Sequence, residues 1–157
     1  MSGRAWARLH DVTLHAVVAL DLEGSPALRQ AFADGIERGF AGELPALPER
    51  ARRYLVRSGG EDVGLLALVE GCPTADEVAV VALAVDPGRR GRAYAAKALL
   101  AAERRLRREG ASEVVARVPR TNGRGLYFML RAGFTPYVPA PEVADRGATW
   151  FKRGGSD

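Results

Sequence analysis

The chain has little cysteine, little lysine and no long apolar run. Cys72 is the one cysteine among 157 residues, so no disulfide can form within the chain, which fits a reducing compartment. The longest apolar run, Val78–Val85, falls far short of the roughly 20 residues that a bilayer requires. The N-terminus lacks a continuous apolar segment followed by a small-residue cleavage site, so no signal peptide is predicted. These absences predict a cytoplasmic protein with no membrane association.

Length and composition predict one globular domain over residues 1–157. Apolar residues make up 47% of the chain and charged residues 27%, fractions that are typical of a folded protein. A chain of this length buries more than half of its unfolded surface, so it needs neither a disulfide nor a metal to hold it together. Residues 154–157 are predicted to be disordered.

The net charge is mildly basic and is carried almost entirely by arginine. There are 23 basic and 19 acidic residues, for a net charge of +4, and Lys97 and Lys152 are the only lysines. Arginine binds phosphate and carboxylate groups through a bidentate fork, although a GC-rich codon supply accounts for most of this bias. The charge favours an anionic ligand and does not by itself indicate nucleic acid, since no aromatic residues interleave with the basic ones.

Hydrophobic patterns and turn residues predict a mixture of strands and helices. Ser25-Pro26 predicts a helix from Pro26 to about Arg38, and Gly59-Gly60 predicts a hairpin between two strands. Glu77–Val85 is apolar on both faces and is predicted to be a central strand. The other predicted strands are 12–20, 53–57, 62–70, 113–118, 134–137 and 148–152; a turn of helix is predicted at 49–54, and longer helices at 93–109 and from an Asn122 cap to 132.

The most informative segment joins the central strand to the following helix. It reads Pro87-Gly88-Arg89-Arg90-Gly91-Arg92-Ala93-Tyr94-Ala95. The first turn of a helix has unpaired amides and a partial positive charge of about half a unit, and flanking arginines add charge-assisted hydrogen bonds. We therefore predict a phosphate-binding loop, with an ordinary turn bearing solvated arginines as the alternative. The patterns of a nucleoside-triphosphate P-loop and of a dinucleotide-binding loop are both absent.

This segment resembles the coenzyme A loop of the GCN5-related N-acetyltransferase (GNAT) family, whose pattern is Arg/Gln-x-x-Gly-x-Gly/Ala. Arg90 and Ala95 match the first and last positions. Ala93 stands where the family has a glycine, and we expect a tighter loop in which Ala93 has a helical φ.

A second stretch resembles the other cofactor segment of the same family, Asn…Phe-Tyr-x-x-x-Gly-Phe. Here the matching residues are Asn122, Phe128 and Gly133-Phe134. The resemblance covers about residues 77–134, with a loose fit of 148–152 to a closing strand. Residues 1–52 match nothing in the family pattern.

The resemblance implies an α/β (α+β) fold with a mixed, mostly antiparallel sheet whose central strands splay apart, flanked by helices. It also implies an N-acetyltransferase that uses acetyl-CoA, with direct attack of a primary amine on the thioester. The backbone of Leu83, Ala84 and Val85 would pair with the pantetheine, and the Asn122 side chain would hold the cofactor arm. Arg90 would contribute charge, and the diphosphate would be received by the amides of Gly91, Arg92, Ala93, Tyr94, Ala95 and Ala96.

The catalytic groups are less clear from the sequence. Glu77 shares strand parity with Ala79, Val81 and Leu83, so these side chains are predicted to face one side of the sheet. Glu77 is the candidate general base, acting through one water, with a solvated carboxylate as the alternative. The family's usual acid, a tyrosine, is replaced by Met129, which has no proton to give. Neither Tyr94 nor Tyr137 can be assigned to that role from the sequence.

Two functions remain open at this point. One is acetyl transfer from acetyl-CoA to a small-molecule or protein amine, and the other is a catalytically weak acyl-CoA sensor or scaffold, which Met129 and Ala79 motivate. Nucleic-acid binding is the least favoured interpretation. The identity of the acceptor and the formation of a homodimer are not decided by the sequence. The stiff segment marked by Pro136, Pro139 and Pro141 is a candidate lining of the acceptor pocket, with a plain linker as the alternative.

Overall fold

The computed structural model describes residues 4–18, 49–86, 92–120, 122–139 and 147–154. The predicted helix at 26–38 and most of the predicted disordered end therefore lie outside the described residues. The strands are β1 (Ala7–Leu9), β2 (Val12–Val17), β3 (Arg52–Ser58), β4 (Glu61–Glu70), β5 (Glu77–Val85), β6 (Glu113–Pro119), β7 (Phe134–Tyr137) and β8 (Ala148–Arg153), and the helices are α2 (Tyr94–Arg108) and α3 (Gly123–Arg131).

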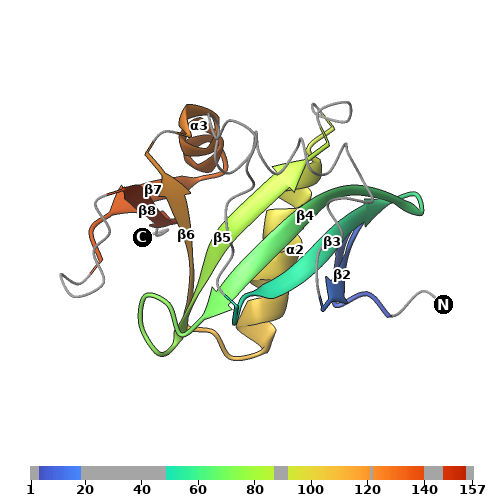
Figure 1. The fold of residues 1–157 in the computed structure, drawn as a ribbon, viewed down its shortest axis with the longest axis horizontal. Coiled ribbons are helices and arrows are strands. Elements are labelled where there is room, and N and C mark those ends of the chain that lie inside the picture. Colours follow the sequence, from blue (N-terminus) through green and yellow to red (C-terminus); the bar gives the residue numbers. More distant parts are fainter. Residues whose placement is uncertain (1–3, 19–48, 87–91, 121, 140–146, 155–157) are drawn as a thin grey trace.

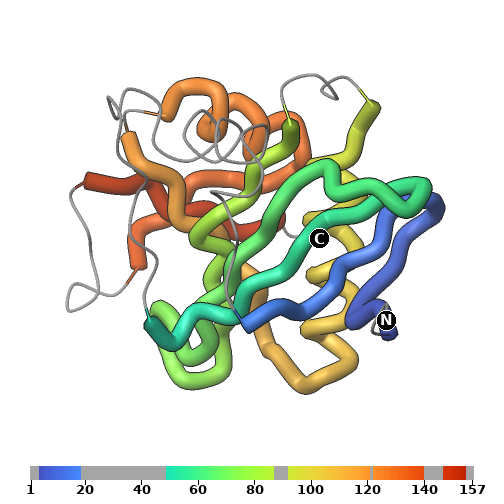
Figure 2. Tube along the Cα trace, turned by 45° about the vertical axis from the view of Figure 1, so that its right-hand side comes forward, coloured from blue at the N-terminus to red at the C-terminus, as the bar shows by residue number. Residues whose placement is uncertain are grey.

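The strands form a single sheet in the order β1-β2-β3-β4-β5-β6-β8-β7. Every neighbouring pair is antiparallel except β5 and β6, which are parallel. Because β8 pairs with both β6 and β7, it lies inside the sheet, although it is the last of the described strands along the sequence (Figure 2). The predicted mixed, mostly antiparallel sheet is confirmed.

Helix α2 covers one face of the sheet (Figure 1). Its buried residues recur at helical spacing, and they include Ala98, Leu99, Ala102 and Leu106. They join one hydrophobic cluster with inward-facing residues of β1 to β6, such as Tyr54 of β3, which is 1% exposed. Among the described residues, no helix is both long enough and apolar enough to cross a membrane.

Most predicted elements are confirmed, and the N-terminal part is where the expectations fail. The predicted strand from residue 12 ends at Val17 within the described residues, and β1 was not predicted at all. The predicted turn of helix at 49–54 is wrong, because Arg52 already begins β3. Tyr54 and Val56 alternate toward the α2 face with the period of a strand, so burial decides the local structure there.

Candidate functional site

The central feature of the sheet is the point at which β5 and β6 part. They pair from Glu77 opposite Glu113 to Val80 opposite Ala116, and the pairing ends there. Beyond that point β5 stays paired to β4, and β6 stays paired to β8. Figure 1 shows the two strands meeting at one end and diverging toward the other. The facing edges therefore carry backbone amides and carbonyls that no strand pairing joins, and a ligand in extended conformation can pair with such edges.

A narrow cavity of about 50 Å³ lies in this gap, and we call it the wedge cavity. Residues 80–83 of β5 and 116–119 of β6 form its walls. Asn122, Phe128 and Met129 close it from the side of α3. The wedge cavity thus begins where the parallel pairing ends.

One wall of the gap depends on an unusually close contact between β4 and β5. A Cβ on Gly64 would lie 2.3 Å from the Ala84 carbonyl oxygen, so only glycine fits there. This approach holds Ala84 and Val85 against β4, and it leaves their other edge toward β6.

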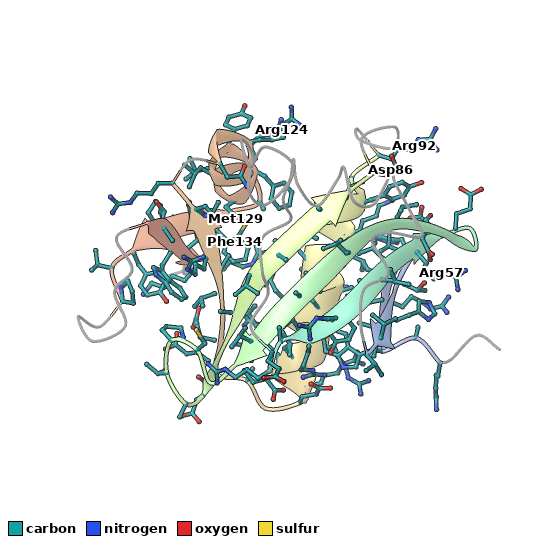
Figure 3. All side chains as sticks on the ribbon, viewed as in Figure 1. Arg57, Asp86, Arg92, Arg124, Met129 and Phe134 are labelled. Carbon is teal, nitrogen blue, oxygen red and sulfur yellow. The ribbon has the colours of Figure 1, made fainter. Side chains whose placement is uncertain are left out.

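A larger cavity of about 460 Å³, which we call the helix-end cavity, lies at the start of α2. It is lined by Val85, by residues 93–96 and by α3 residues that include Arg124 and Phe128. Phe128 also lines the wedge cavity, so the two cavities are neighbours. Arg124 and Arg92 are exposed, and both lie at the end of the molecule toward which the gap opens (Figure 3). The helix-end cavity therefore has an apolar floor and a basic rim.

The start of α2 has the properties that favour an anion. Ala93 precedes it, no side chain caps it, and its first turn contains no acidic residue. The Ala93 carbonyl accepts the bond from the Lys97 amide at 2.9 Å, so the amides of Tyr94, Ala95 and Ala96 have no partner within the helix. Arg90 and Gly91, which belong to the same predicted loop, lie outside the described residues.

Ala93 adopts φ 60° and ψ 22°, in the left-handed region. The expectation of an ordinary helical φ is therefore wrong. A Cβ in this region approaches the following carbonyl oxygen, which is why glycine suits the position better. The backbone turns sharply here, directly before Tyr94, Ala95 and Ala96, which line the helix-end cavity.

The Asn122 side chain is buried at 1% exposure and caps α3, with its Oδ1 accepting a hydrogen bond from the Gly125 amide at 2.9 Å. The same residue lines the wedge cavity. Cofactor binding by its amide stays a prediction.

The Tyr94 hydroxyl is hydrogen-bonded to Ser58 at the end of β3 and to Arg92 of the predicted loop. These two contacts hold the pKa of Tyr94 below its ordinary value. The part of Tyr94 that the helix-end cavity requires is thus its amide, while its side chain fixes the start of α2 to the sheet.

Glu77 begins β5, three residues before the last parallel pair, and lines neither cavity. The Thr74 hydroxyl donates a hydrogen bond to its carboxylate. Ala79 and Val81 share an outer cluster away from α2, as the parity predicted. Leu83 does not share this face of the sheet, because the register shifts between Ala67 and Leu68 and leaves Val81 without a partner on β4. This bulge turns Leu83 toward the α2 side, where it packs against the main core.

The sequence reasoning left two aromatic residues of that outer cluster without a role. The cluster comprises Cys72, Ala79, Val81, Val115, Tyr137 and Trp150, and we call it the outer-face cluster. Burial raises the pKa of Tyr137 to about 12, with a further contribution from the nearby Glu77 carboxylate. Within the part of the chain that the structure describes, Tyr137 Oη and Trp150 Nε1 are buried without a hydrogen-bond partner. Only the strand register, which no local pattern encodes, brings them together.

Comparison with known proteins agrees with this geometry. The model of the acetyltransferase (GNAT) family matches residues 20–134. The parallel strands β5 and β6 part beside the start of α2, and this arrangement defines the class of fold. The match of the family model over most of the chain shows the family. The chain belongs to the acetyltransferase (GNAT) family. No curated protein matches it in sequence.

Solved structures of the same fold span most of the chain. An acetyltransferase from Thermus thermophilus is 25% identical, with a TM-score of 0.64, and the match covers 90% of this chain and 96% of that one. A Bacillus subtilis acetyltransferase in complex with CoA is 16% identical, with a TM-score of 0.62 over 89% and 96% of the chains. A putative streptothricin acetyltransferase from Bacillus anthracis, in complex with acetyl coenzyme A, is 11% identical, with a TM-score of 0.55 over 68% and 64%. At these lower identities the likeness concerns the fold.

Proposed function

We propose that this chain is an acetyl-CoA-dependent N-acetyltransferase that transfers the acetyl group to the primary amine of an acceptor. The observation that carries the proposal is the parting of β5 and β6 after Val80 and Ala116, with one cavity in the gap and a larger one beside the start of α2. Family membership and the complexes of two fold neighbours with CoA and acetyl coenzyme A support it.

Coenzyme A fits the residues that surround the two cavities. Its diphosphate would meet the amides of Ala93 and of Tyr94, Ala95 and Ala96, the last three of which have no partner within the helix, with charge from Arg92 and Arg124 at the rim. Its pantetheine arm is extended and carries amides, so it can pair with the free edge of Leu83, Ala84 and Val85. The side chain of Asn122 lies on the opposite wall. Arg90 and Gly91 complete the proposed loop outside the described residues.

Bound acetyl-CoA supplies an acetyl group activated as a thioester, and the protein must hold it and manage protons. A lysine-like amine has an ordinary pKa near 10.4 and must lose a proton before it attacks. We assign that role to Glu77, acting through one water, because its carboxylate lies on the outer face with Tyr137 and close enough to raise the pKa of that tyrosine. The edge amides near Val81 would stabilise negative charge on the carbonyl oxygen.

A second function is favoured by one specific observation. Met129 is 4% exposed and lines the wedge cavity, at the position where the family has a tyrosine acid. A cavity wall without a proton donor suits a protein that binds acyl-CoA as a sensor and transfers the acyl group slowly. A missing general acid costs on the order of 10²–10⁴ in rate.

Two measurements test the proposal. Calorimetry with acetyl-CoA measures binding, and thiol release over a panel of amines measures transfer. Arg124→Glu is expected to weaken acetyl-CoA binding by about tenfold through like-charge repulsion. Arg104→Glu, on the exposed side of α2, is the matched control and is expected to leave binding unchanged. Binding of acetyl-CoA without thiol release from any amine would favour the sensor. Equal affinity of the two variants for acetyl-CoA would show that the helix-end cavity is not part of the cofactor site.

A further inference from the structure

The two sides of the parting point differ in what surrounds them. On one side it is covered by α2 and the main hydrophobic core, which includes Val80 and Ala116. On the other side lies the outer-face cluster, whose Val81 also lines the wedge cavity. The outer-face cluster therefore borders the wedge cavity on the side away from α2, and its polar groups are candidates for a role toward the acceptor.

Three residues of different strands form one row on this side. Tyr137 of β7 is the register partner of Trp150 of β8, and Trp150 is the register partner of Arg117 of β6. Partners directly opposite one another in antiparallel strands point to the same face, with Cβ atoms roughly 5 Å apart. Arg117 itself lines the wedge cavity. The row thus leads from the parting point outward along the sheet.

The row contains two buried hydrogen-bond donors that the described part of the protein leaves without an acceptor. Trp150 is 5% exposed, and its Nε1 is a donor only. The Tyr137 hydroxyl keeps its proton at neutral pH, since its pKa is about 12. Leaving such donors unpaired is unfavourable, so two of them side by side call for an explanation.

We infer that the acceptor is an amine that also carries a carboxylate, and that Tyr137 and Trp150 donate hydrogen bonds to that carboxylate. The inference rests on the proposed acetyl transfer. A carboxylate offers two acceptor oxygens to the two donors. The Arg117 guanidinium in the same row adds positive charge on the Trp150 side, and the Glu77 and Glu113 carboxylates lie on the Tyr137 side. The Glu77 carboxylate, on the same side of the sheet, suits the amine end of such a molecule. Free amino acids have this combination of groups.

The test compares matched acceptors that differ in one group: phenylalanine, phenylalaninamide and phenethylamine, and alanine, alaninamide and ethylamine. The native protein is expected to prefer the amino acid over the plain amine by at least tenfold in kcat/KM, with the amide between them. Tyr137→Phe keeps the ring and removes the donor, so it is expected to raise KM for the amino acid by roughly tenfold and to leave KM for acetyl-CoA unchanged. Because it removes an unpaired buried donor, its melting temperature is expected to stay level or to rise. Trp150→Phe is expected to act on KM in the same direction.

Tyr54→Phe is the control, since it removes the hydroxyl of a buried tyrosine that faces α2 and lies outside the outer-face cluster. It is expected to leave the preference for amino acids unchanged. Equal turnover of phenylalanine and phenethylamine, or an unchanged preference in Tyr137→Phe, would overturn the inference.

A binding measurement separates this inference from the proposed transfer. Calorimetry of N-acetylphenylalanine and N-acetylphenethylamine, added to the protein with coenzyme A, requires no turnover. Tighter binding of the carboxylate compound, lost in Tyr137→Phe, supports the inference even where no amine releases thiol, and in that case the transfer alone fails. Equal binding of the two compounds overturns the carboxylate site whether or not transfer occurs.

Discussion

The Glu103 carboxylate of α2 and the Arg153 guanidinium of β8 form a two-pronged ion pair, with Nη2 at 2.6 Å from Oε1 and Nε at 2.9 Å from Oε2. Glu103 is 2% exposed. The same guanidinium donates through Nη1 to the Ala132 carbonyl at 2.8 Å, directly after α3. One arginine therefore connects α2, β8 and the end of the helix that lines both cavities.

Arg153→Met is expected to lower the free energy of unfolding by about 3 kcal/mol, because it leaves a buried carboxylate without its partner. Urea denaturation measures the change. Lys97→Met is the control, since it breaks the ion pair of Lys97 with the exposed Asp11, 2.8 Å apart, and is expected to change the free energy of unfolding far less. Equal losses in the two variants would contradict the role of Arg153.

Ala93→Gly is expected to raise the free energy of unfolding by about 1 kcal/mol, because glycine adopts the left-handed conformation without the Cβ contact. Thermal or urea denaturation detects the change. Ala96→Gly, in the first turn of α2, is expected to have the opposite sign and to cost roughly 0.5 kcal/mol. A lower free energy of unfolding in both variants would show that Ala93 is not strained.

Gly64→Ala is expected to destabilise the protein by about 2 kcal/mol and to weaken coenzyme A binding, since the new methyl group would push the Ala84 carbonyl toward the gap. Gly123→Ala is the control at the start of α3, where a Cβ meets nothing within 4 Å. It is expected to be neutral or slightly stabilising. Denaturation and calorimetry provide the two readouts, and unchanged coenzyme A affinity in Gly64→Ala would separate this wall from the cofactor.

The pH dependence of stability is expected to include Glu109. Burial alone would raise the pKa of this carboxyl, but hydrogen bonds from Trp6, Arg105 and Arg52 outweigh burial and hold the pKa below its ordinary value of 4.5. Between the two values the unfolded chain binds more protons, so the contribution is complete above about pH 4.5 and is lost as the pH falls through the folded value.

In urea denaturation from about pH 6 to about pH 3, Glu109→Gln is expected to lose less stability than the native protein. Glu61→Gln, at the start of β4, is the comparison variant, since it removes a carboxyl that accepts none of these three hydrogen bonds. If the stability of Glu109→Gln falls with pH as steeply as that of the native protein, the Glu109 carboxyl does not contribute to the pH dependence.

Met129→Tyr is expected to raise the rate of acetyl transfer by at least about tenfold, because it introduces a proton donor in the wall of the wedge cavity. The larger side chain costs about 1–3 kcal/mol of stability in this buried position. Met129→Phe has the same bulk without the hydroxyl, so it is expected to show the stability loss and no gain in rate. Equal rates in the two variants would mean that the reaction proceeds without a protein acid at this position.

The sequence predicted best where local and global signals agree. Gly59-Gly60 marks the β3–β4 hairpin, with both glycines at positive φ, and Asn122 caps α3 as its sequence context suggested. Strand β5 has the predicted bounds because its apolar residues are buried on both faces. In each case the chemistry of a few neighbouring residues is sufficient to specify the conformation.

Prediction from the sequence failed where tertiary contacts determine the conformation. The bulge at Val81 shifts the register by one residue, and strand parity counted along the sequence cannot detect it. The alignment of Tyr137 with Trp150 and Arg117 depends on three strands from separate parts of the chain. Ala93 adopts a left-handed conformation that alanine does not favour, so the residue type at this position could not predict it.

The position of β8 between β6 and β7 has a consequence for how the protein is made. During synthesis the N-terminal strands and α2 leave the ribosome well before residues 148–153 exist. Until β8 inserts, β7 has no neighbour, β6 lacks its second partner, and Arg153 has not reached Glu103. The half of the sheet that holds the proposed amine pocket can therefore assemble only after residues 148–153 have been translated.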